Sequence, residues 1–500
     1  MHEEINFKYE LINSIPVLSW IMKVTSFKDV LVKHGSMVEC KSSFFVSGVW
    51  AGDFETGDFI NTTFSCCSGA SSYCIDNNFV IVVSTPSHLQ ETLYMYRDEN
   101  ALLFSNSLPF LLKETGKVLN PDYYNYEQDL CSIIYGEKKL INQIKLKEDK
   151  TIIMFRNSNI FIRNDLSFRS VSKSIHNRFK DFNDYYCYLR SVLSKIVNNS
   201  IDNHRIHRYG MISTISRGYD APAVSVMAHE MGCVETMTMR EPYYDNGKSI
   251  AIQLGYKKVY EIERDDYKRS DYLLEAEAAA VGLVGGLIFE SNERICSGKL
   301  IFMGTRGDSV WGRSQKYVNE DLAFPYNGYA QASLSPIEHL LRINSIVIHV
   351  PLIGADSWPD IVAISNSPEM KPWAIGGNYD RPIARRIVEE KGVHREDFGQ
   401  HKYGAGISFH FNTFNNLKNK MSLNSYESLL AYKNNLKRKR IKDIINRINF
   451  LISEFPVYFN VLSTKLNIRF YLNEQSKGRK SSPIANLMIL WGIHEMTKRY

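Results

Sequence analysis

The pattern of apolar and polar positions divides the chain at about residue 170. Before that point, short apolar runs rich in β-branched and aromatic residues alternate with Gly, Asn and Asp, which favour turns. The clearest of these runs are residues 44–50, 78–83, 101–107 and 151–155. This spacing predicts a β-rich N-terminal domain over residues 1–170.

After residue 170 the pattern changes to apolar strands that alternate with longer helical segments. A charged helical stretch is expected at 171–201, and strands are expected at 209–215, 234–239, 258–263 and 299–303. Helical runs begin between these strands at Pro222, Lys248 and Asp271. Alternation of this kind is typical of a parallel sheet with helices on both faces. Residues 320–500 read as mainly helical, so we expect a second domain over 171–500 with a helical C-terminal region.

Composition and charge fit a globular chain and exclude several classes. Hydrophobic residues make up 44% of the 500 residues and charged residues 23%, and the net charge is a modest +6. No apolar run reaches the roughly 18–20 residues that a membrane span needs. The first four residues, Met-His-Glu-Glu, lack the basic and then apolar pattern of a secretory signal. We therefore expect a cytoplasmic protein without a membrane span.

The eight cysteines are sparse, and only Cys66, Cys67 and Cys74 lie close together in the sequence. No histidine or cysteine pair with metal-ligand spacing accompanies them, so reduced thiols are favoured over a zinc site.

A short loop with glycine and one carboxylate follows the expected strand at 209–215. It comprises Ser216 to Asp220, and Pro222 suits the first turn of the helix that begins there. The free N–H groups at a helix N-terminus attract phosphate, whereas Asp220 would repel phosphate unless a cation lay between them. The pattern therefore indicates a magnesium–polyphosphate site.

A second loop of this type, Gly304 to Gly312, follows the strand at 299–303 and contains Asp308. Ligands of open parallel sheets bind at the carboxyl ends of the strands, where both loops are expected. If the two strands are neighbours, Asp220 and Asp308 can share a metal ion. The alternative is that both loops are ordinary turns, in which Gly and Asp are common.

These loops resemble the signatures of the asparagine-synthetase superfamily of ATP pyrophosphatases. Residues 216–221 match three of the five fixed positions of Ser-Gly-Gly-x-Asp-Ser, and Gly304 to Arg313 resemble the second signature through Gly304, Asp308, Val310, Trp311 and Gly312. Residues 395–402 resemble the segment that carries the family's catalytic lysine, here Lys402, before Gly404-Ala405-Gly406. The first 170 residues resemble the family's glutamine-hydrolysing domain.

The resemblance implies a two-domain α/β and α+β fold. A degenerate glutaminase-like domain of the N-terminal-nucleophile type, residues 1–170, would precede a parallel-sheet ATP pyrophosphatase (PP-loop) domain, residues 171–500. It further implies ATP and Mg²⁺ as cofactors, with the metal on Asp220 and Asp308. The implied nucleotide contacts are Ser216, Arg217, Gly218, Asp220, Met237 and Gly304, with Met237 near the adenine and core packing as the alternative for that residue. The implied catalytic residues are Lys402, Asp220 and Asp308.

Departures from the family pattern bear on activity. His2 stands where glutamine hydrolysis needs a cysteine nucleophile, as in the β-lactam-forming and lasso-peptide-cyclising relatives that share this loss. Arg217 replaces a glycine and could either bind phosphate or fill the nucleotide cradle. Ala221 and Ser309 replace a serine and a glutamate, so one hydroxyl and one acidic group of the family pattern are missing.

The resemblance thus predicts an AMP-forming ligase that adenylates a carboxylate and makes an amide without its own glutaminase activity. The substrate would be a small molecule, a peptide or a sugar acid, and a partner could supply substrate or ammonia. Two alternatives stay open: an inactive nucleotide-binding scaffold of the same fold, and an RNA-modifying ATP pyrophosphatase. The run Lys437–Arg440 is the only basic cluster, so we do not expect a nucleic-acid partner. Residues 376–382 could line an acceptor pocket or simply lead into the helix expected at 383–391.

Overall fold

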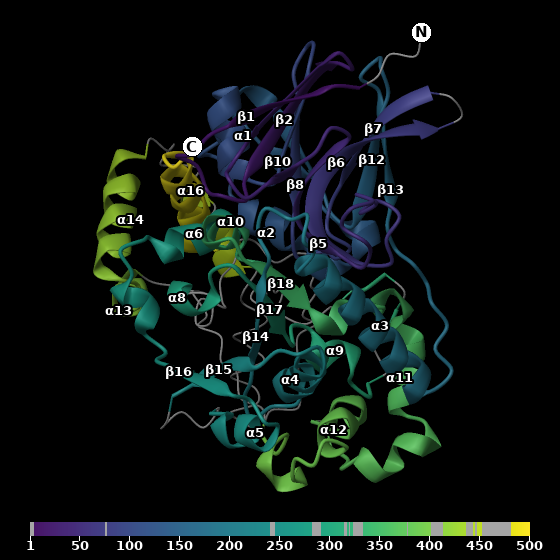
Figure 1. Ribbon diagram of the computed structural model, residues 1–500. Coiled ribbons are helices and arrows are strands. Elements are labelled where there is room, and N and C mark those ends of the chain that lie inside the picture. The colour runs from purple at the N-terminus through teal and green to yellow at the C-terminus, as the bar shows by residue number, and fades with distance from the viewer. Residues whose placement is uncertain are drawn as a thin grey trace.

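The computed structural model describes most of the chain. The described residues are 5–75, 78–240, 246–282, 292–314, 318–319, 321–323, 334–377, 379–401, 414–436, 444–445, 448–452 and 482–500. Within these ranges the protein is a mixed α/β structure with two largely antiparallel sheets, one parallel sheet and a helical C-terminal region (Figure 1). None of the helices in these ranges combines the length and the apolar character that a membrane span requires.

The N-terminal part is β-rich, as predicted, and consists of two sheets that pack face to face. The first sheet has the order β1-β3-β2-β9-β8-β11-β10 and comprises Phe7–Leu11, Asp29–His34, Trp20–Ser26, Leu102–Ser105, Leu93–Arg97, Thr151–Phe155 and Gln143–Lys145. The second has the order β13-β12-β7-β6-β5-β4 and comprises Phe168–Ser172, Ser158–Ile162, Asn78–Ser84, Ser65–Ile75, Phe44–Trp50 and Glu39–Cys40. Their shared core joins Trp20 of the first sheet to Phe45 of the second, with ring centroids 4.9 Å apart.

Helices from three separate parts of the chain cover the other face of the first sheet. They are α1 (Leu108–Thr115), α2 (Tyr126–Leu130), α6 (Leu274–Ala280) and the C-terminal α16 (Pro483–Thr497). Figure 1 shows α16, in yellow, beside α6. The two helices can approach closely because residue 492 is glycine: a Cβ at this position would lie only 2.6 Å from the carbonyl oxygen of Ala276. The C-terminal helix therefore links the N-terminal sheets to the parallel-sheet part.

The parallel sheet contains the four predicted strands and a fifth. Its order is β16-β15-β14-β17-β18, comprising Lys258–Ile262, Glu235–Met239, Gly210–Thr214, Lys299–Met303 and Ile346–His349, and every pair is parallel. The fifth strand, β18, lies in the segment that we expected to be helical. It has only four residues, all buried, and so short an apolar run has no periodicity that distinguishes a strand from a helix.

Helices cover both faces of this sheet, as predicted. Leu300 and Phe302 of β17 pack toward α4 (Asp220–Glu230) and α3 (Phe182–Ser200), whereas Ile301 packs toward α10 (Ile337–Ile343). The remaining described helices that this account uses are α5 (Lys248–Gln253), α8 (Glu293–Cys296), α9 (Gly307–Val310), α11 (Trp358–Ser365), α12 (Pro382–Glu389), α13 (Phe414–Lys420) and α14 (Leu423–Asn435).

The helix expected from residue 171 begins later, at Phe182. Residues up to Ser172 belong to β13, and the segment from 173 to 180 has no regular structure. The helix starts where Asp181 takes the N-cap position and its side chain accepts a hydrogen bond from the N–H of Asp184. The cap, rather than the charge pattern, sets the boundary.

Two buried glutamates anchor the C-terminus. Glu277 forms ion pairs with His339, Arg342 and Arg499. Burial would raise its pKa, but these neighbours lower the pKa well below its usual range. Glu338 accepts hydrogen bonds from the hydroxyls of Ser107 (2.7 Å) and Tyr500 (3.0 Å). Among the described residues, no Lys or Arg lies within ion-pair distance of Glu338. Burial raises the pKa of Glu338 to about 7.

The raised pKa of Glu338 predicts that the free energy of unfolding decreases as the pH rises. Between its ordinary pKa of 4.5 and about 7, the folded state holds a proton that the unfolded state has lost, so stability falls as pH rises through this window. Glu338→Gln removes this titration. From pH 5 to pH 8, we expect the variant to gain on the order of 2–3 kcal/mol of unfolding free energy relative to the wild type. Denaturant titration at both pH values measures this. Glu10→Gln, at an exposed position, is the control. An identical pH dependence in wild type and Glu338→Gln would contradict the assignment.

Candidate functional site

The carboxyl ends of β14 and β17 form the centre of the candidate site. The two strands pair directly, with Met211 opposite Leu300 and Ser213 opposite Phe302. From β14 the chain proceeds to β15 and β16 on one side, whereas β17 continues to β18 on the other. The strand order therefore reverses between β14 and β17, which is where open α/β sheets bind their ligands. The two strands are therefore neighbours, which a site shared by Asp220 and Asp308 requires.

The first loop is folded by its own side chains. The Ser216 hydroxyl accepts a hydrogen bond from the N–H of Gly218 (3.1 Å), and α4 begins at Asp220. Tyr219 is buried, and its hydroxyl accepts a hydrogen bond from the Arg385 guanidinium of α12 (2.6 Å). The Arg217 side chain is exposed. The loop conformation is thus held from the protein side, while residue 217 projects from the packed core.

The second loop touches the first at Asp220. A Cβ at Gly304 would lie 2.9 Å from the Cβ of Asp220, and a Cβ at Gly307 would lie 2.7 Å from its carboxyl carbon. Glycine is therefore needed at both positions for the loops to meet. Asp308 follows Gly307 directly in α9 and is partly exposed, as Asp220 is. The structure thus brings the two aspartates onto loops that are in contact.

Met237 lies in the interior of the sheet. Its side chain is fully buried, and its sulfur is 3.9 Å from that of Cys296. Met237 also shares a core cluster with Ile212 and Ile301. These contacts correspond to the core-packing alternative for this residue.

Lys402 lies outside the described residues, but the chain just before it packs on the first loop. The N–H of Gly399 donates to the carbonyl of Arg217 (2.8 Å). Gly399 has φ +64°, and a Cβ there would lie 2.4 Å from the Tyr219 ring. Phe398 meets the same ring edge-on at 6.1 Å. The segment resembling the family's lysine motif is therefore anchored at the candidate site as far as it is described.

Two further side chains reach the site from residues 376–382, the loop before α12. The sequence alone allowed this loop either to line a pocket or simply to lead into the helix. The Tyr379 ring is tilted against the Tyr219 ring, with centroids 4.8 Å apart. Burial, followed by the charge of Asp220, raises the pKa of Tyr379. The guanidinium carbon of Arg381 would be 3.6 Å from a Cβ at Gly312. The Nε of Arg381 is buried and has no hydrogen-bond partner in the described part of the chain.

This loop does lead into α12, and it is held in place by Asp380. Asp380 is buried, forms an ion pair with Arg313 (2.9 Å) and accepts the N–H of Gly376 (3.0 Å). Arg313 follows the second loop, so the ion pair ties the two segments together. Nothing in the spacing of the sequence connects residues 379–381 with residues 220 and 312. Only the polar and aromatic residues of this loop indicated that it could line a pocket.

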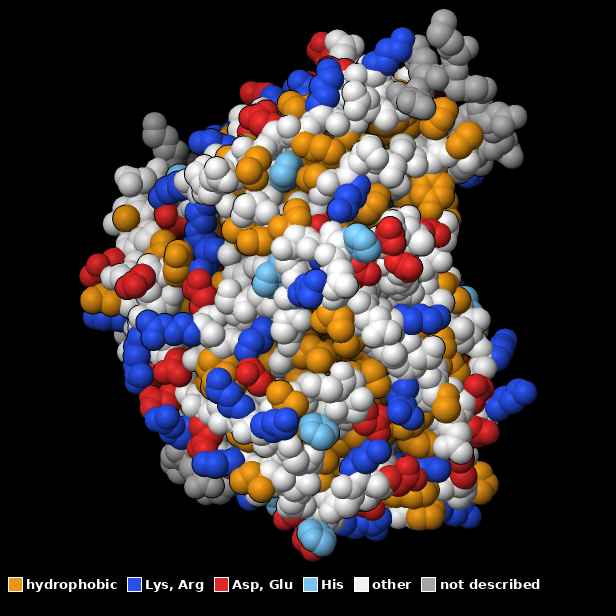
Figure 2. Space-filling model, viewed as in Figure 1, with side chains coloured by type: hydrophobic (Ala, Val, Ile, Leu, Met, Phe, Trp, Pro, Cys, Tyr) orange, Lys and Arg blue, Asp and Glu red, His pale blue; other side chains and the backbone are white. Residues whose placement is uncertain are grey.

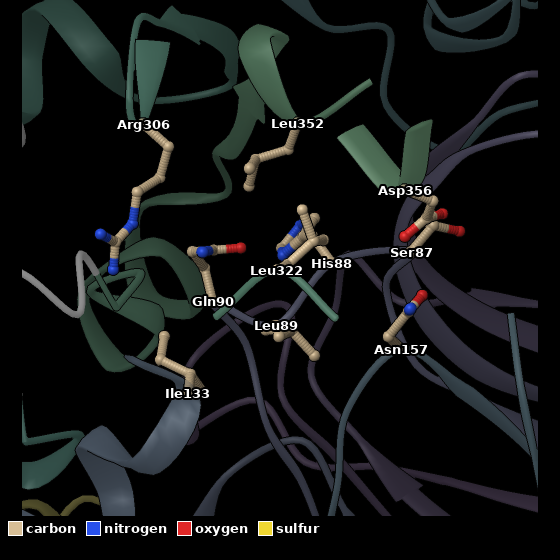
Figure 3. A pocket seen from close by; sticks show the side chains of 10 residues that line it. All are labelled: Ser87, His88, Leu89, Gln90, Ile133, Asn157, Arg306, Leu322, Leu352 and Asp356. Atoms are coloured by element: carbon tan, nitrogen blue, oxygen red, sulfur yellow. The ribbon is translucent and has the colours of Figure 1, made fainter. Parts of the chain in front are cut away.

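A small cavity lies behind the second loop, between the N-terminal sheets and the parallel sheet (Figure 3). Its volume of about 20 Å³ has room for roughly one water molecule. Arg306 lines it from the second loop and His88 from the segment between β7 and β8. Arg306 is buried, which lowers the pKa of its guanidinium to about 10, although the charge of Asp308 opposes this shift. The cavity therefore adjoins the candidate site through Arg306 and Asp308.

No protein-family model matches this chain, and a search of curated proteins finds no match either. The arrangement of the loops themselves is thus the basis for assigning a function.

The contact at Gly307 predicts an unequal response to alanine substitution. Gly307→Ala would place a methyl group 2.7 Å from the Asp220 carboxyl carbon, so we expect a loss of about 1–3 kcal/mol from overpacking. Gly210→Ala is the matched control because the nearest atom, 3.3 Å away, belongs to the flexible Lys299 side chain. Denaturant unfolding of both variants measures the difference. Equal stabilities would show that the loops do not pack as described.

Proposed function

We propose that the parallel-sheet part is an ATP-dependent carbon–nitrogen ligase that releases AMP and pyrophosphate. The observation that carries the proposal is the contact between Asp220 and the Gly304–Gly307 loop at the point where the strand order reverses. Two carboxylates on touching loops, beside the N-terminus of α4, suit a polyphosphate that is bound through a divalent cation. The resemblance of residues 216–221 and 304–313 to the ATP pyrophosphatase signatures supports the same conclusion.

The residues present fit Mg²⁺ and ATP. Asp220 and Asp308 supply the carboxylate oxygens that Mg²⁺ prefers, and the metal would offset the charge of the phosphates. Ser216, Gly218 and Gly304 would form the phosphate cradle, with Arg217 at its exposed rim. Arg381 brings a guanidinium whose buried Nε has no hydrogen-bond partner in the described residues and would donate to an oxyanion.

The proposed reaction has two steps. An oxygen of the substrate carboxylate bonds to the α-phosphorus of ATP, and the bond to pyrophosphate breaks. An amine nitrogen then attacks the activated carbonyl, the bond to AMP breaks, and the amine proton passes to solvent. Arg217, Arg381 and, on the resemblance, Lys402 would offset the negative charge that develops on the phosphates and the carbonyl oxygen. The loops contribute mainly by holding both substrates in position.

The source of the amine lies outside the N-terminal sheets in this proposal. The resemblance implies a glutaminase-like domain without the family's cysteine nucleophile, so this proposal includes no release of ammonia from glutamine by these sheets. The amine would come from the substrate itself, from free ammonia or from a partner protein. The activated carboxylate would belong to a small molecule, a peptide or a sugar acid.

The surface gives little support for a nucleic-acid substrate. On the face drawn in Figure 2, Lys and Arg side chains are interspersed with Asp and Glu over the parallel-sheet part. Binding to a phosphate backbone favours a basic stripe with interleaved aromatic side chains instead. A ligase for a smaller acid therefore remains the preferred proposal.

The two aspartates should account for the magnesium dependence of nucleotide binding. We expect Asp220→Asn and Asp308→Asn each to weaken Mg-ATP binding by roughly 10–100-fold, because each variant loses a charged ligand. Binding of ATP without Mg²⁺ should not fall, since a repulsive charge has been removed. Titration calorimetry with and without Mg²⁺ separates the two effects, and Asp265→Asn, at an exposed site, is the control.

Two outcomes would count against the proposal. Unchanged Mg-ATP affinity in both variants would place the nucleotide elsewhere. Tight Mg-ATP binding by the wild type with no pyrophosphate release in a panel of amino acids, peptides and sugar acids would favour the catalytically inactive scaffold.

We expect the Arg381 side chain to bind a phosphate or carbonyl oxyanion rather than to stabilise the fold. We expect Arg381→Gln to lower Mg-ATP affinity or the rate of pyrophosphate release by about 10-fold or more, the value of one charge-assisted hydrogen bond. Arg381→Lys should recover part of the loss because it restores the charge without the fork geometry. A Gln variant with wild-type binding and turnover would remove Arg381 from the site.

A further inference from the structure

A second cluster of metal-ligating side chains lies between the N-terminal sheets and the parallel sheet. His88 and Glu91 come from the segment between β7 and β8, and His349 is the last residue of β18. One ligand atom from each residue lies within 4.8 Å of the other two. The His88 and His349 rings meet at nearly right angles with centroids 5.0 Å apart. Three ligand atoms this close can surround one ion after small side-chain shifts, because zinc–ligand distances are roughly 2.0–2.2 Å.

The imidazole nitrogens of this cluster are buried and short of partners. Both ring nitrogens of His88 and the Nδ1 of His349 have no hydrogen-bond partner among the described residues. The two residues are only 4% and 3% exposed. A buried polar group without a partner is uncommon, because it has lost its hydration without compensation. Figure 3 shows the His88 ring pointing into the cavity beneath the second loop.

Ser335 orients the other members of the cluster. Its hydroxyl bonds the Nε2 of His349 (2.8 Å) and also the Glu91 carboxyl group, and its N–H donates to the carbonyl of Gln90 (3.0 Å). Because Ser335 engages the Nε2 of His349, the unpartnered Nδ1 is the atom left to bind a metal ion. Metal-bound histidines are oriented by a bond of this kind at the other nitrogen.

The donor set of the cluster favours a metal that binds imidazole. It offers two imidazoles and only one carboxylate, whereas Mg²⁺ is bound mainly through oxygen ligands. Zinc binds through nitrogen lone pairs as well as through carboxylate, and two histidines with one glutamate are a known zinc ligand set that leaves a fourth position open.

We propose that His88, Glu91 and His349 bind one Zn²⁺ ion that joins the N-terminal sheets to the carboxyl edge of the parallel sheet. The ion would fix the 87–91 segment against the end of β18. Since His349 pairs with Met303, the residue before Gly304, this position is one strand away from the second loop of the candidate nucleotide site. The site is chemically distinct from Asp220 and Asp308, which offer oxygen only.

The test is zinc binding by the full-length protein after treatment with a chelator. Competition with a chromophoric indicator should give one equivalent of tightly bound Zn²⁺ in the wild type. His88→Gln and His349→Gln should each weaken it by more than the roughly 10–100-fold that second-shell changes cost. His394→Gln, at an exposed histidine, and Asp220→Asn should keep it, and excess Mg²⁺ should not displace it. Retention in Asp220→Asn separates this site from the proposed nucleotide site.

A measurement on the wild type guards against variants that fail to fold. X-ray absorption of the zinc-loaded protein should count two imidazole ligands with the remainder oxygen. The absence of stoichiometric zinc, equal affinity in both histidine variants and the wild type, or a ligand shell with fewer than two imidazoles would each overturn the proposal.

Discussion

The close approach of Asp220 to Gly304 and Gly307 is the constraint on which the parallel-sheet part depends. It requires β14 and β17 to be direct neighbours, it requires glycine where any side chain would collide, and it fixes the start of α4 against the second loop. The first loop is in turn held by Tyr219, which Arg385 and Gly399 contact from the opposite side. Asp220 and Asp308 thereby lie on touching loops at the edge of the sheet, as the proposed metal site requires.

The N-terminal sheets are held against the parallel-sheet part at two places. Their 87–91 segment closes over the carboxyl edge of the parallel sheet, where Gln90 bonds Ser335 and His88 meets His349. On the other side, α16 ties the first sheet to α6, and the buried Glu277 and Glu338 bind the last two residues, Arg499 and Tyr500. Both connections run between segments that are far apart in the chain, so the two halves of the protein stabilise each other.

Local patterns predicted much of the fold. Four of the five parallel strands, the β-rich character of the N-terminal part and the presence of α4, expected from Pro222 and found from Asp220, follow from apolar runs and turn residues, which act over a few residues. The apolar run of β18 has only four residues, which is too short to show a period. The helix α3 starts later than its pattern predicted because the N-cap at Asp181 sets its first turn.

The site was predictable only in part, because its remaining members meet through the fold. Asp220 and Asp308 follow strands, so the rule that ligands bind at carboxyl ends could pair them. Tyr379 and Arg381 come from a loop that no period or spacing connects to those strands. His88 and His349 are still further apart in sequence, and their pairing depends on how the N-terminal sheets sit on the parallel sheet.

A crystal structure of the protein with Mg²⁺ and a non-hydrolysable ATP analogue tests the central claim most directly. The account predicts one Mg²⁺ ion about 2.0–2.1 Å from an oxygen of Asp220 and from one of Asp308, with the phosphates resting on the loops after β14 and β17. Phosphates bound away from these loops, or an ion that contacts neither aspartate, would contradict it.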